Sequence, residues 1–291
     1  TLIRNEIGSA FGIRFDRDGR TVIAMPGVPL EMERMMQSAI IPDIEQSMTR
    51  GTILIERIRT AGLFESQLVT RFSQLDAVRA VADVAVLPKP TGVELRFTVK
   101  APDRIAADHR MAHALRMVQE DLSPWIVSIG EQTMEDVIAG MLTSAGRTVA
   151  TAESCTGGLV AHRLTNVPGS SAYMRGGIVS YSNDVKSQSL GVPADLIESL
   201  GAVSAAVAEA MASGVRERMA ADYGVATTGI AGPGGGSDAK PVGTVYVAVA
   251  GPAGVTSECH HYPMDRKLNK ERFATAALDL LRRALINDSK V

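Results

Sequence analysis

A serine, a cysteine and a threonine follow one another where an apolar run meets two glycines, in the stretch TAESCTGGLVAHRL (151–164). A strand-to-helix junction of this kind brings hydroxyl and thiol groups beside free backbone N–H groups, which favours anions and developing oxyanions. Ser154 could therefore be a nucleophile, although Ser154 or Thr156 could equally cap the helix. The stretch is not a GxSxG elbow, because Ala152 replaces the first glycine. Cys155 is a rival nucleophile, since a thiol at a helix N-terminus is acidified, but it has no evident histidine partner.

A lysine that could activate this serine lies in GGIVSYSNDVKSQSLGV (176–192), where a strand runs into a polar segment that can start a helix. Lys186 then falls in or near the first turn, where the helix dipole disfavours its charge and burial would lower its pKa. A partly neutral amine is the general base that a serine hydroxyl needs. The alternative is a solvated surface lysine. Tyr181, at the strand end, is either a core ring with a wet hydroxyl or a second polar group of the site.

The loop in TTGIAGPGGGSDAKPVGTV (227–245) follows an apolar strand and is rich in glycine. Its backbone N–H groups could surround an anion as a nest does, or the loop could be a plain hairpin connection with Asp238 and Lys240 at a solvated tip. It is not a P-loop, because the GxxxxGK[ST] spacing is absent. Arg266, at the start of the last expected helix, could hold a phosphate or carboxylate, or pair with Asp265.

The histidines predict no metal site. His109 and His113 lie four residues apart on one expected helix face without a third ligand, and His260 and His261 point to opposite faces of an expected strand. The two cysteines are too few for a disulfide framework and show no zinc spacing. We therefore expect reduced thiols and a cytoplasmic protein.

Composition narrows the classes of partner. The 291 residues include 45% hydrophobic residues, enough to bury real cores, and the formal net charge is -2. This charge gives no basic surface for nucleic acid or for an anionic membrane, so neither is expected as a partner. No apolar run approaches the roughly 18 to 20 residues that span a bilayer.

The first segment of the chain, residues 1–50, predicts a short strand, a Pro-Gly-Val-Pro turn and a helix. The residues expected on one side of this helix are Met32, Met35, Met36 and Ile40. One strand and one helix are too little for a domain. Because the chain opens on Thr1 without a capping or strand-leading segment, we expect that the natural N-terminus is missing.

Two further segments follow. Residues 51–127 mix strand and helix patterns and predict a small α+β module, and the Pro- and Gly-containing stretch 122–132 is the expected linker. Residues 128–291 alternate helices with apolar strands, which is typical of a layered α/β fold. The strands expected there are residues 148–152, 177–181, 224–228, 244–250 and 256–262.

Four separated motifs together resemble the C-terminal nicotinamide-nucleotide amidase domain of the CinA family. They are TAESCTGGLVAHRLTNVPGSSAYMRGGIVSYSNDVKSQSLGV, GAVS, GIAGPGGGSDAKPVGTVYVAVA and DRKLNKERFATAAL, in the family order, and the resemblance covers about residues 131–288. It implies an α/β/α layered domain that hydrolyses nicotinamide mononucleotide to nicotinate mononucleotide and ammonia. Residues 1–50 resemble the end of the family's molybdopterin-binding-like domain, and residues 51–127 its KH-like middle module. That module has no GxxG and ten Lys and Arg against nine Asp and Glu, so RNA binding is unsupported.

On this resemblance the catalytic residues are Ser154 as the nucleophile, Lys186 as the base and Tyr181 at the strand end, and Arg266 binds substrate. The other positions that would bind substrate are Thr156, Gly157, Gly158, Ser171, Thr228, Gly229, Gly232, Gly234 and Gly235. Two residues depart from the family pattern. Lys270 stands where many members have a second arginine and lacks its bidentate fork, and Met264 replaces a glycine, which would restrict approach to the backbone at that corner.

The resemblance implies no cofactor for the amidase, a divalent metal only if the N-terminal domain is complete and active, and a homodimer. Oxyanion stabilisation is expected from backbone N–H groups around residues 156–158. Two alternatives belong to other classes of function. One is metal-dependent hydrolysis of ADP-ribose by the N-terminal domain, and the other is a non-catalytic nucleotide sensor built on the same pocket.

Overall fold

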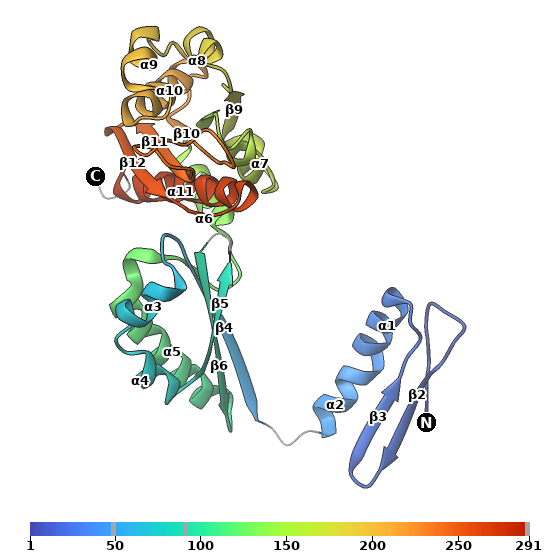
Figure 1. The fold of residues 1–291 in the computed structure, drawn as a ribbon. Helices are drawn as coiled ribbons and strands as arrows, with labels where there is room; N and C mark the ends of the chain where they lie inside the picture. The colour runs from blue at the N-terminus through green and yellow to red at the C-terminus, as the bar shows by residue number, and fades with distance from the viewer. Residues whose placement is uncertain (48–50, 90–91, 289–291) are drawn as a thin grey trace. The chain divides into compact units, whose positions relative to one another are not determined.

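The computed structural model describes residues 1–47, 51–89 and 92–288, and the chain divides into two compact units (Figure 1). One unit comprises Thr1–Ile53 with Lys100–Ala107, and the other comprises Leu54–Val99 with Asp108–Val291. No helix in the described part of the chain is both long enough and apolar enough to cross a membrane.

The N-terminal segment forms a three-stranded antiparallel sheet and an interrupted helix. Its elements are β1 (Leu2–Ile3), β2 (Gly12–Arg17), β3 (Arg20–Ala24), α1 (Pro29–Met35), the π-helical η1 (Met36–Ile40) and α2 (Ile41–Ser47). Asp18 and Gly19 join β2 to β3 with φ angles of 51° and 72°, as a tight hairpin turn requires. The prediction of one strand missed two. Met35 and Ile40 are buried as predicted, whereas Met32 is exposed.

Residues 51–129 build a four-stranded sheet in the order β5-β6-β4-β7, backed by helices. The elements are β4 (Thr52–Thr60), α3 (Glu65–Arg71), α4 (Leu75–Arg79), β5 (Asp83–Lys89), β6 (Gly92–Ala101), α5 (Arg104–Leu122), η2 (Ser123–Trp125) and β7 (Ile126–Ile129). The connection between β5 and β6 lies largely outside the described residues. Along β6, Val93, Leu95, Phe97 and Val99 are buried and alternate with polar residues, as a sheet with one covered face requires.

The stretch predicted as a linker, residues 122–132, contains a strand. Its middle forms β7, which pairs antiparallel with β4 so that Ile58 lies opposite Ile129. The predicted boundary between residues 127 and 128 therefore falls inside a strand. The proline that suggested a linker lies in the short helix η2 before this strand, and the glycine follows its last residue.

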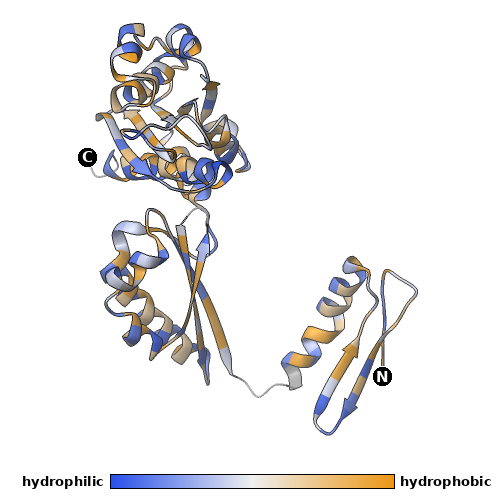
Figure 2. Ribbon diagram, viewed as in Figure 1, coloured by the Kyte–Doolittle hydropathy of each residue, from blue (hydrophilic) through white to orange (hydrophobic). Residues whose placement is uncertain are grey.

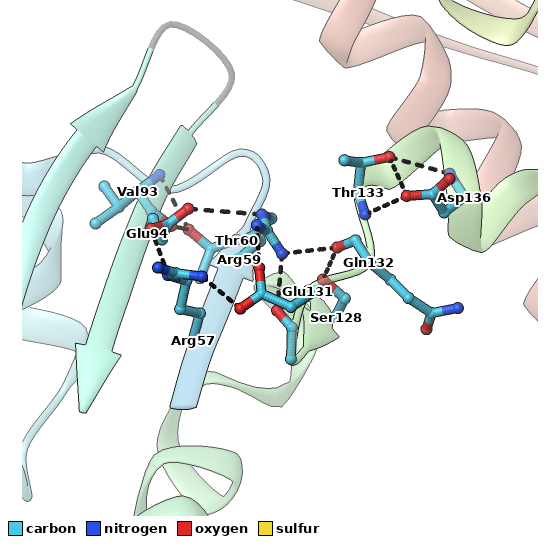
Figure 3. A network of polar contacts seen from close by, with 11 residues as sticks. Arg57, Arg59, Thr60, Val93, Glu94, Ser128, Glu131, Gln132, Thr133 and Asp136 are labelled. Carbon is cyan, nitrogen blue, oxygen red and sulfur yellow. Dashed lines mark hydrogen bonds and ion pairs between the residues drawn. The ribbon is translucent and has the colours of Figure 1, made fainter. Parts of the chain in front are cut away.

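Polar contacts fix the short connection that follows β7 (Figure 3). Arg59 donates from Nη1 to the carbonyl oxygens of Gly130 at 2.8 Å and Gln132 at 2.9 Å. Arg57 pairs with Glu131 and with Glu94 of β6. Two arginines of β4 thus hold the segment that leads into the C-terminal domain.

The C-terminal domain has a five-stranded sheet in the order β12-β11-β10-β8-β9. The strands are β8 (Val149–Glu153), β9 (Met174–Val179), β10 (Tyr223–Gly229), β11 (Thr244–Gly251) and β12 (Gly254–His261). The helices are α6 (Met134–Ala145), α7 (Leu159–Thr165), η3 (Ser170–Ala172), α8 (Asn183–Leu190), α9 (Ala194–Leu200), α10 (Ala205–Arg218) and α11 (Arg266–Asp288). β8 lies parallel to both β9 and β10, and β11 lies antiparallel to β10. All five predicted strands are present, with ends shifted by a few residues.

Two cores, one on each face of this sheet, confirm the layered α/β fold. On one face Val225 and Val247 pack with α6, α7 and α11, and on the other Ala152 and Ala226 pack with α8, α9 and α10. Figure 2 shows hydrophobic residues along the central strands. Because β8 is buried along its whole length, the polar residues that follow it are held at a fixed edge of the sheet.

Candidate active site

Most of the candidate residues lie in the segments that follow β8, β9 and β10 at one edge of the sheet. The three strands are parallel, so the segments that follow them emerge side by side, as at the ligand-binding edge of other open α/β sheets. Two backbone bonds join these segments. The N–H of Ser154 donates to the carbonyl of Thr227 at 3.0 Å, and the N–H of Ser180 donates to the carbonyl of Glu153 at 2.8 Å.

Ser154 opens the loop between β8 and α7. Gly157 and Gly158 have φ angles of 64° and 94°, a left-handed conformation that favours glycine and explains the pair in the sequence. Ser154 is half-buried, and within the described chain its hydroxyl forms no hydrogen bond. A hydroxyl left free in this way can be directed at a substrate.

The first turn of α7 is occupied by a side chain that the sequence reasoning missed. One carboxylate oxygen of Glu153, Oε2, accepts from Gly158 N at 2.9 Å and Val160 N at 3.1 Å, and the other, Oε1, accepts from Ala161 N at 2.8 Å. The predicted use of the Gly158 N–H for a substrate oxyanion is therefore wrong, because that donor already serves Glu153. The available signal was an acidic residue just before a helix start, where the helix dipole favours a carboxylate.

Thr156 is also committed to the protein itself. Its hydroxyl is fully buried, donates to Glu153 at 2.6 Å and lies 2.7 Å from the hydroxyl of Thr227. The hydroxyl of Thr156 is therefore occupied within the protein, and the predicted binding of substrate at Thr156 stays a prediction. The two hydroxyl groups therefore differ. The hydroxyl of Thr156 stabilises the loop through hydrogen bonds, whereas the hydroxyl of Ser154 forms none within the described chain.

The rival nucleophile Cys155 does not have the predicted acidity. Its side chain is buried, and burial raises the pKa of the Cys155 thiol to about 12, with the Glu153 charge adding to the effect. A thiol in this state is almost never a thiolate at neutral pH. Proximity to the start of α7 does not acidify it, because desolvation outweighs the helix dipole.

Lys186 lies on α8 with its side chain 2% exposed. Its Nζ donates to the carbonyl oxygens of Ser180 at 3.0 Å and Tyr181 at 3.4 Å, and no described carboxylate pairs with it. Burial lowers the pKa of Lys186 below its ordinary value of 10.5, although the neighbouring Cys155 opposes the shift. α8 begins at Asn183 with Ser182 as its cap, so the predicted place of Lys186 near the helix start is confirmed.

Arg266 connects the end of β9 with the glycine-rich loop. Its Nη2 donates to the hydroxyl of Tyr181 at 2.9 Å, and its Nη1 donates to the carbonyl of Gly232 at 2.8 Å. Tyr181 is 61% exposed, so its ring is not a core residue. Asn269, a second residue that the sequence reasoning missed, is buried and donates to the carbonyl of Ala231 at 3.1 Å, which ties the same loop to α11.

The glycines predicted to bind substrate in the glycine-rich loop differ in why the structure uses glycine there. Gly232 and Gly235 have φ angles of 89° and 87° and so favour glycine, whereas a Cβ on Gly234 would have no atom within 4 Å. Gly229 is a packing position, because a Cβ there would lie 2.6 Å from the carbonyl oxygen of Thr244.

Two polar side chains anchor this loop. The hydroxyl of Thr228, predicted to contact substrate, donates to the carbonyl of Ala202 at 2.7 Å. Lys240 donates to the carbonyl of Leu200 at 2.8 Å, so it is not a free loop tip.

Ser171 is not brought to this edge by its own chain. It lies in η3, immediately before β9, whereas Tyr181 follows the end of β9. Six residues of extended strand, at about 3.3 Å each, separate the two edges of the sheet by roughly 20 Å. Ser171 therefore lies at the opposite edge of the sheet within one chain, and its predicted binding of substrate stays a prediction.

The two departures from the family pattern have different consequences. The Nζ of Lys270 lies 3.5 Å from the point that a Cβ on Gly157 would occupy, so its positive charge stands beside the loop that carries Ser154. Met264 does not adopt a positive φ, and its predicted effect on approach to the backbone at this corner stays a prediction. Among the described residues, no group of three His, Cys, Asp or Glu side chains could hold a metal ion.

Comparison with known families identifies the chain. The model of the CinA C-terminal domain matches residues 131–285, and that of the damage-inducible protein CinA KH domain matches residues 56–128. The chain belongs to the CinA family. A CinA-like protein of Frankia casuarinae is 40% identical over 285 residues, covering 97% of this chain and 66% of that protein. Another, of Chloroherpeton thalassium, is 39% identical over 293 residues, covering 98% and 70%. The chain thus spans about two thirds of the length of these relatives.

Solved CinA structures resemble about half of the chain. The competence/damage inducible protein CihA of Agrobacterium tumefaciens is 41% identical with a TM-score of 0.51, covering 53% of this chain and 96% of that one. A CinA superfamily protein of Klebsiella pneumoniae is 30% identical with a TM-score of 0.51, covering 54% and 99%.

Proposed function

We propose that the C-terminal domain hydrolyses the carboxamide of nicotinamide mononucleotide to give nicotinate mononucleotide and ammonia, a step of pyridine nucleotide recycling. The observation that carries this proposal is the environment of Lys186. A neutral amine has two N–H donors and one lone pair, and the carbonyls of Ser180 and Tyr181 can accept from both donors. The lone pair is then free to take a proton, which is the property of a general base.

The reaction begins when Lys186 removes the proton of Ser154 and the serine oxygen attacks the carboxamide carbon. Lys186 then delivers the proton to the amide nitrogen, the carbon–nitrogen bond breaks, and ammonia leaves an acyl-enzyme ester on Ser154. Water attacks this ester, Lys186 takes the proton of the water and returns it to the serine oxygen, and the carboxylate product leaves. No metal or cofactor is required by these steps.

The oxyanion needs donors other than the one predicted at Gly158. The N–H of Gly157 forms no hydrogen bond within the described chain, and the ammonium of Lys270 is beside the same glycine. Each such donor is worth about 3 kcal/mol of transition-state stabilisation in comparable enzymes. We assign the oxyanion to these two groups.

The 5′-phosphate is assigned to the side of the site formed by Arg266 and the glycine-rich loop. The guanidinium is exposed and has further N–H donors beyond the two that bind Tyr181 and Gly232. Holding the phosphate there would orient the amide toward Ser154, and such positioning can supply several kcal/mol of a reaction barrier.

The test is ammonia release from nicotinamide mononucleotide in the presence of EDTA, with nicotinamide riboside as the substrate that lacks phosphate. We expect release from the mononucleotide and little from the riboside. Ser154→Ala should abolish release and leave binding of the mononucleotide, measured by calorimetry, within twofold of the parent.

Ser144→Ala, an exposed change at the end of α6, is the matched control and should keep full activity. Binding without release in the unmodified protein would overturn the proposal and favour a nucleotide sensor. An active Ser154→Ala variant would remove the serine from the mechanism.

A further inference from the structure

A buried carboxylate holds together the loop that carries Ser154. Glu153 is 1% exposed and accepts four hydrogen bonds, one from the hydroxyl of Thr156 and three from the N–H groups of Gly158, Val160 and Ala161. Both carboxylate oxygens are used, Oε2 by three donors and Oε1 by one. The side chain therefore fixes the loop and the first turn of α7 as one unit.

The main chain of the same residue reaches the segment that carries the base. The carbonyl of Glu153 accepts from the N–H of Ser180 at 2.8 Å, and the carbonyl of Ser180 accepts from Lys186 Nζ at 3.0 Å. One residue thus binds the nucleophile's loop through its side chain and the base's segment through its backbone.

We propose that Glu153 is the positioning residue of this site. Its carboxylate sets the direction in which the Ser154 hydroxyl and the Gly157 N–H point, and the proposal rests on the function assigned above to Ser154. Gly157 and Gly158 have no side chains that could restrict this loop, so its geometry depends on bonds to a neighbour. A carboxylate at this place also keeps an anionic substrate group away from the start of α7, which leaves the phosphate to Arg266.

The variant Glu153→Gln tests the proposal with the smallest change in shape. An amide has only one acceptor oxygen, so its NH₂ group faces at least one of the donors that the carboxylate bound. The loop must shift to relieve this contact, and a misplacement of about 1 Å at a reacting group can cost on the order of 10²-fold in rate. We expect kcat to fall by about 10²-fold, while the dissociation constant of nicotinamide mononucleotide stays within twofold.

The matched control is Asp136→Asn. Asp136 caps the start of α6 in the same domain and accepts from the N–H of Thr133 at 2.9 Å and from its hydroxyl at 2.8 Å. Both variants remove a carboxylate that caps a helix, so both should lower the melting temperature. A merely structural role of Glu153 predicts equal activity for the two variants once each is folded.

The decisive readout measures the serine without the substrate. Phenylmethylsulfonyl fluoride forms a sulfonyl ester with a nucleophilic serine, fluoride leaves, and the serine proton passes to the base. The rate of labelling, followed by intact mass and mapped to Ser154, should fall about 10²-fold in Glu153→Gln and stay unchanged in Asp136→Asn.

Equal labelling of Glu153→Gln and the parent would overturn the positioning role alone. Absence of both labelling and ammonia release in the parent would overturn the function proposed for Ser154. If Glu153→Gln does not fold, Thr156→Val removes one donor to the same carboxylate and carries the same expectation of slower labelling.

Discussion

Replacement of Lys186 by methionine tests whether a buried neutral amine operates in this site. The change keeps an unbranched side chain of similar length in the same buried position and removes the titrating group. If Lys186 is the base, kcat/KM of the parent rises tenfold per pH unit below the pKa of the amine and then levels off. Burial lowers this pKa, so the plateau is reached below the ordinary value of 10.5.

The size of the effect follows from the single lone pair. Turnover requires that Lys186 has lost one proton, so a plot of log(kcat/KM) against pH has a slope of one below the pKa of the amine. Loss of a general base costs roughly 10²- to 10⁴-fold, so we expect Lys186→Met to lower kcat/KM by that factor and to remove the slope. Steady-state ammonia release between pH 6 and pH 10 measures both quantities.

The same group makes a prediction for stability. Between the lowered pKa of folded Lys186 and 10.5, the unfolded chain binds one proton more than the folded protein. The free energy of unfolding therefore rises with pH by up to about 1.4 kcal/mol per pH unit in this window. The contribution is complete above pH 10.5 and is lost as the pH falls through the window.

Urea denaturation of the parent and of Lys186→Met over the same pH range isolates this slope as a difference. Lys267→Met, a change of an exposed lysine on α11, is the control and should keep the slope of the parent. The reasoning is refuted if Lys186→Met retains a rate within tenfold of the parent together with the same pH profile.

Two further variants test the neighbours of this group. Arg266→Lys can keep only one of the bonds to Tyr181 and Gly232. We therefore expect the KM for nicotinamide mononucleotide to rise roughly tenfold and the preference for the mononucleotide over the riboside to shrink. An unchanged preference would exclude the assignment of the phosphate to Arg266. Cys155→Ala should retain activity within twofold of the parent. Iodoacetamide at pH 8 should modify the exposed Cys259 but not the buried Cys155, because burial raises the pKa of the Cys155 thiol to about 12. Alkylation of Cys155 in the folded protein would contradict its burial.

Much of the fold could be predicted because its signals are local. Apolar runs placed the five strands of the C-terminal sheet, and the order of strands and helices indicated a layered α/β domain. The middle module was predicted less well. β7 is only four residues long and is flanked by Pro124 and Gly130, so its pairing with β4 leaves little trace in the sequence.

Some residues of the candidate site could likewise be placed from the sequence, and others could not. Ser154 and Tyr181 follow the ends of the parallel strands β8 and β9, and Lys186 lies on the helix after β9. Because parallel strands end at one edge of a sheet, the placement of these residues at the same edge could be expected from the sequence. Ser171 shares the family's sequence pattern but precedes β9, and only the direction of that strand shows that it lies at the other edge.

The sequence by itself determined the positions of the candidate polar residues relative to the strands, and it marked the two glycines in the loop after Ser154. The tertiary structure alone decided their chemical states. Desolvation raises the pKa of Cys155 and lowers that of Lys186, and it depends on how completely the surrounding helices cover each group. The role of Glu153 was decided there too, because a carboxylate joins four donors only when strand and helix have already been brought together.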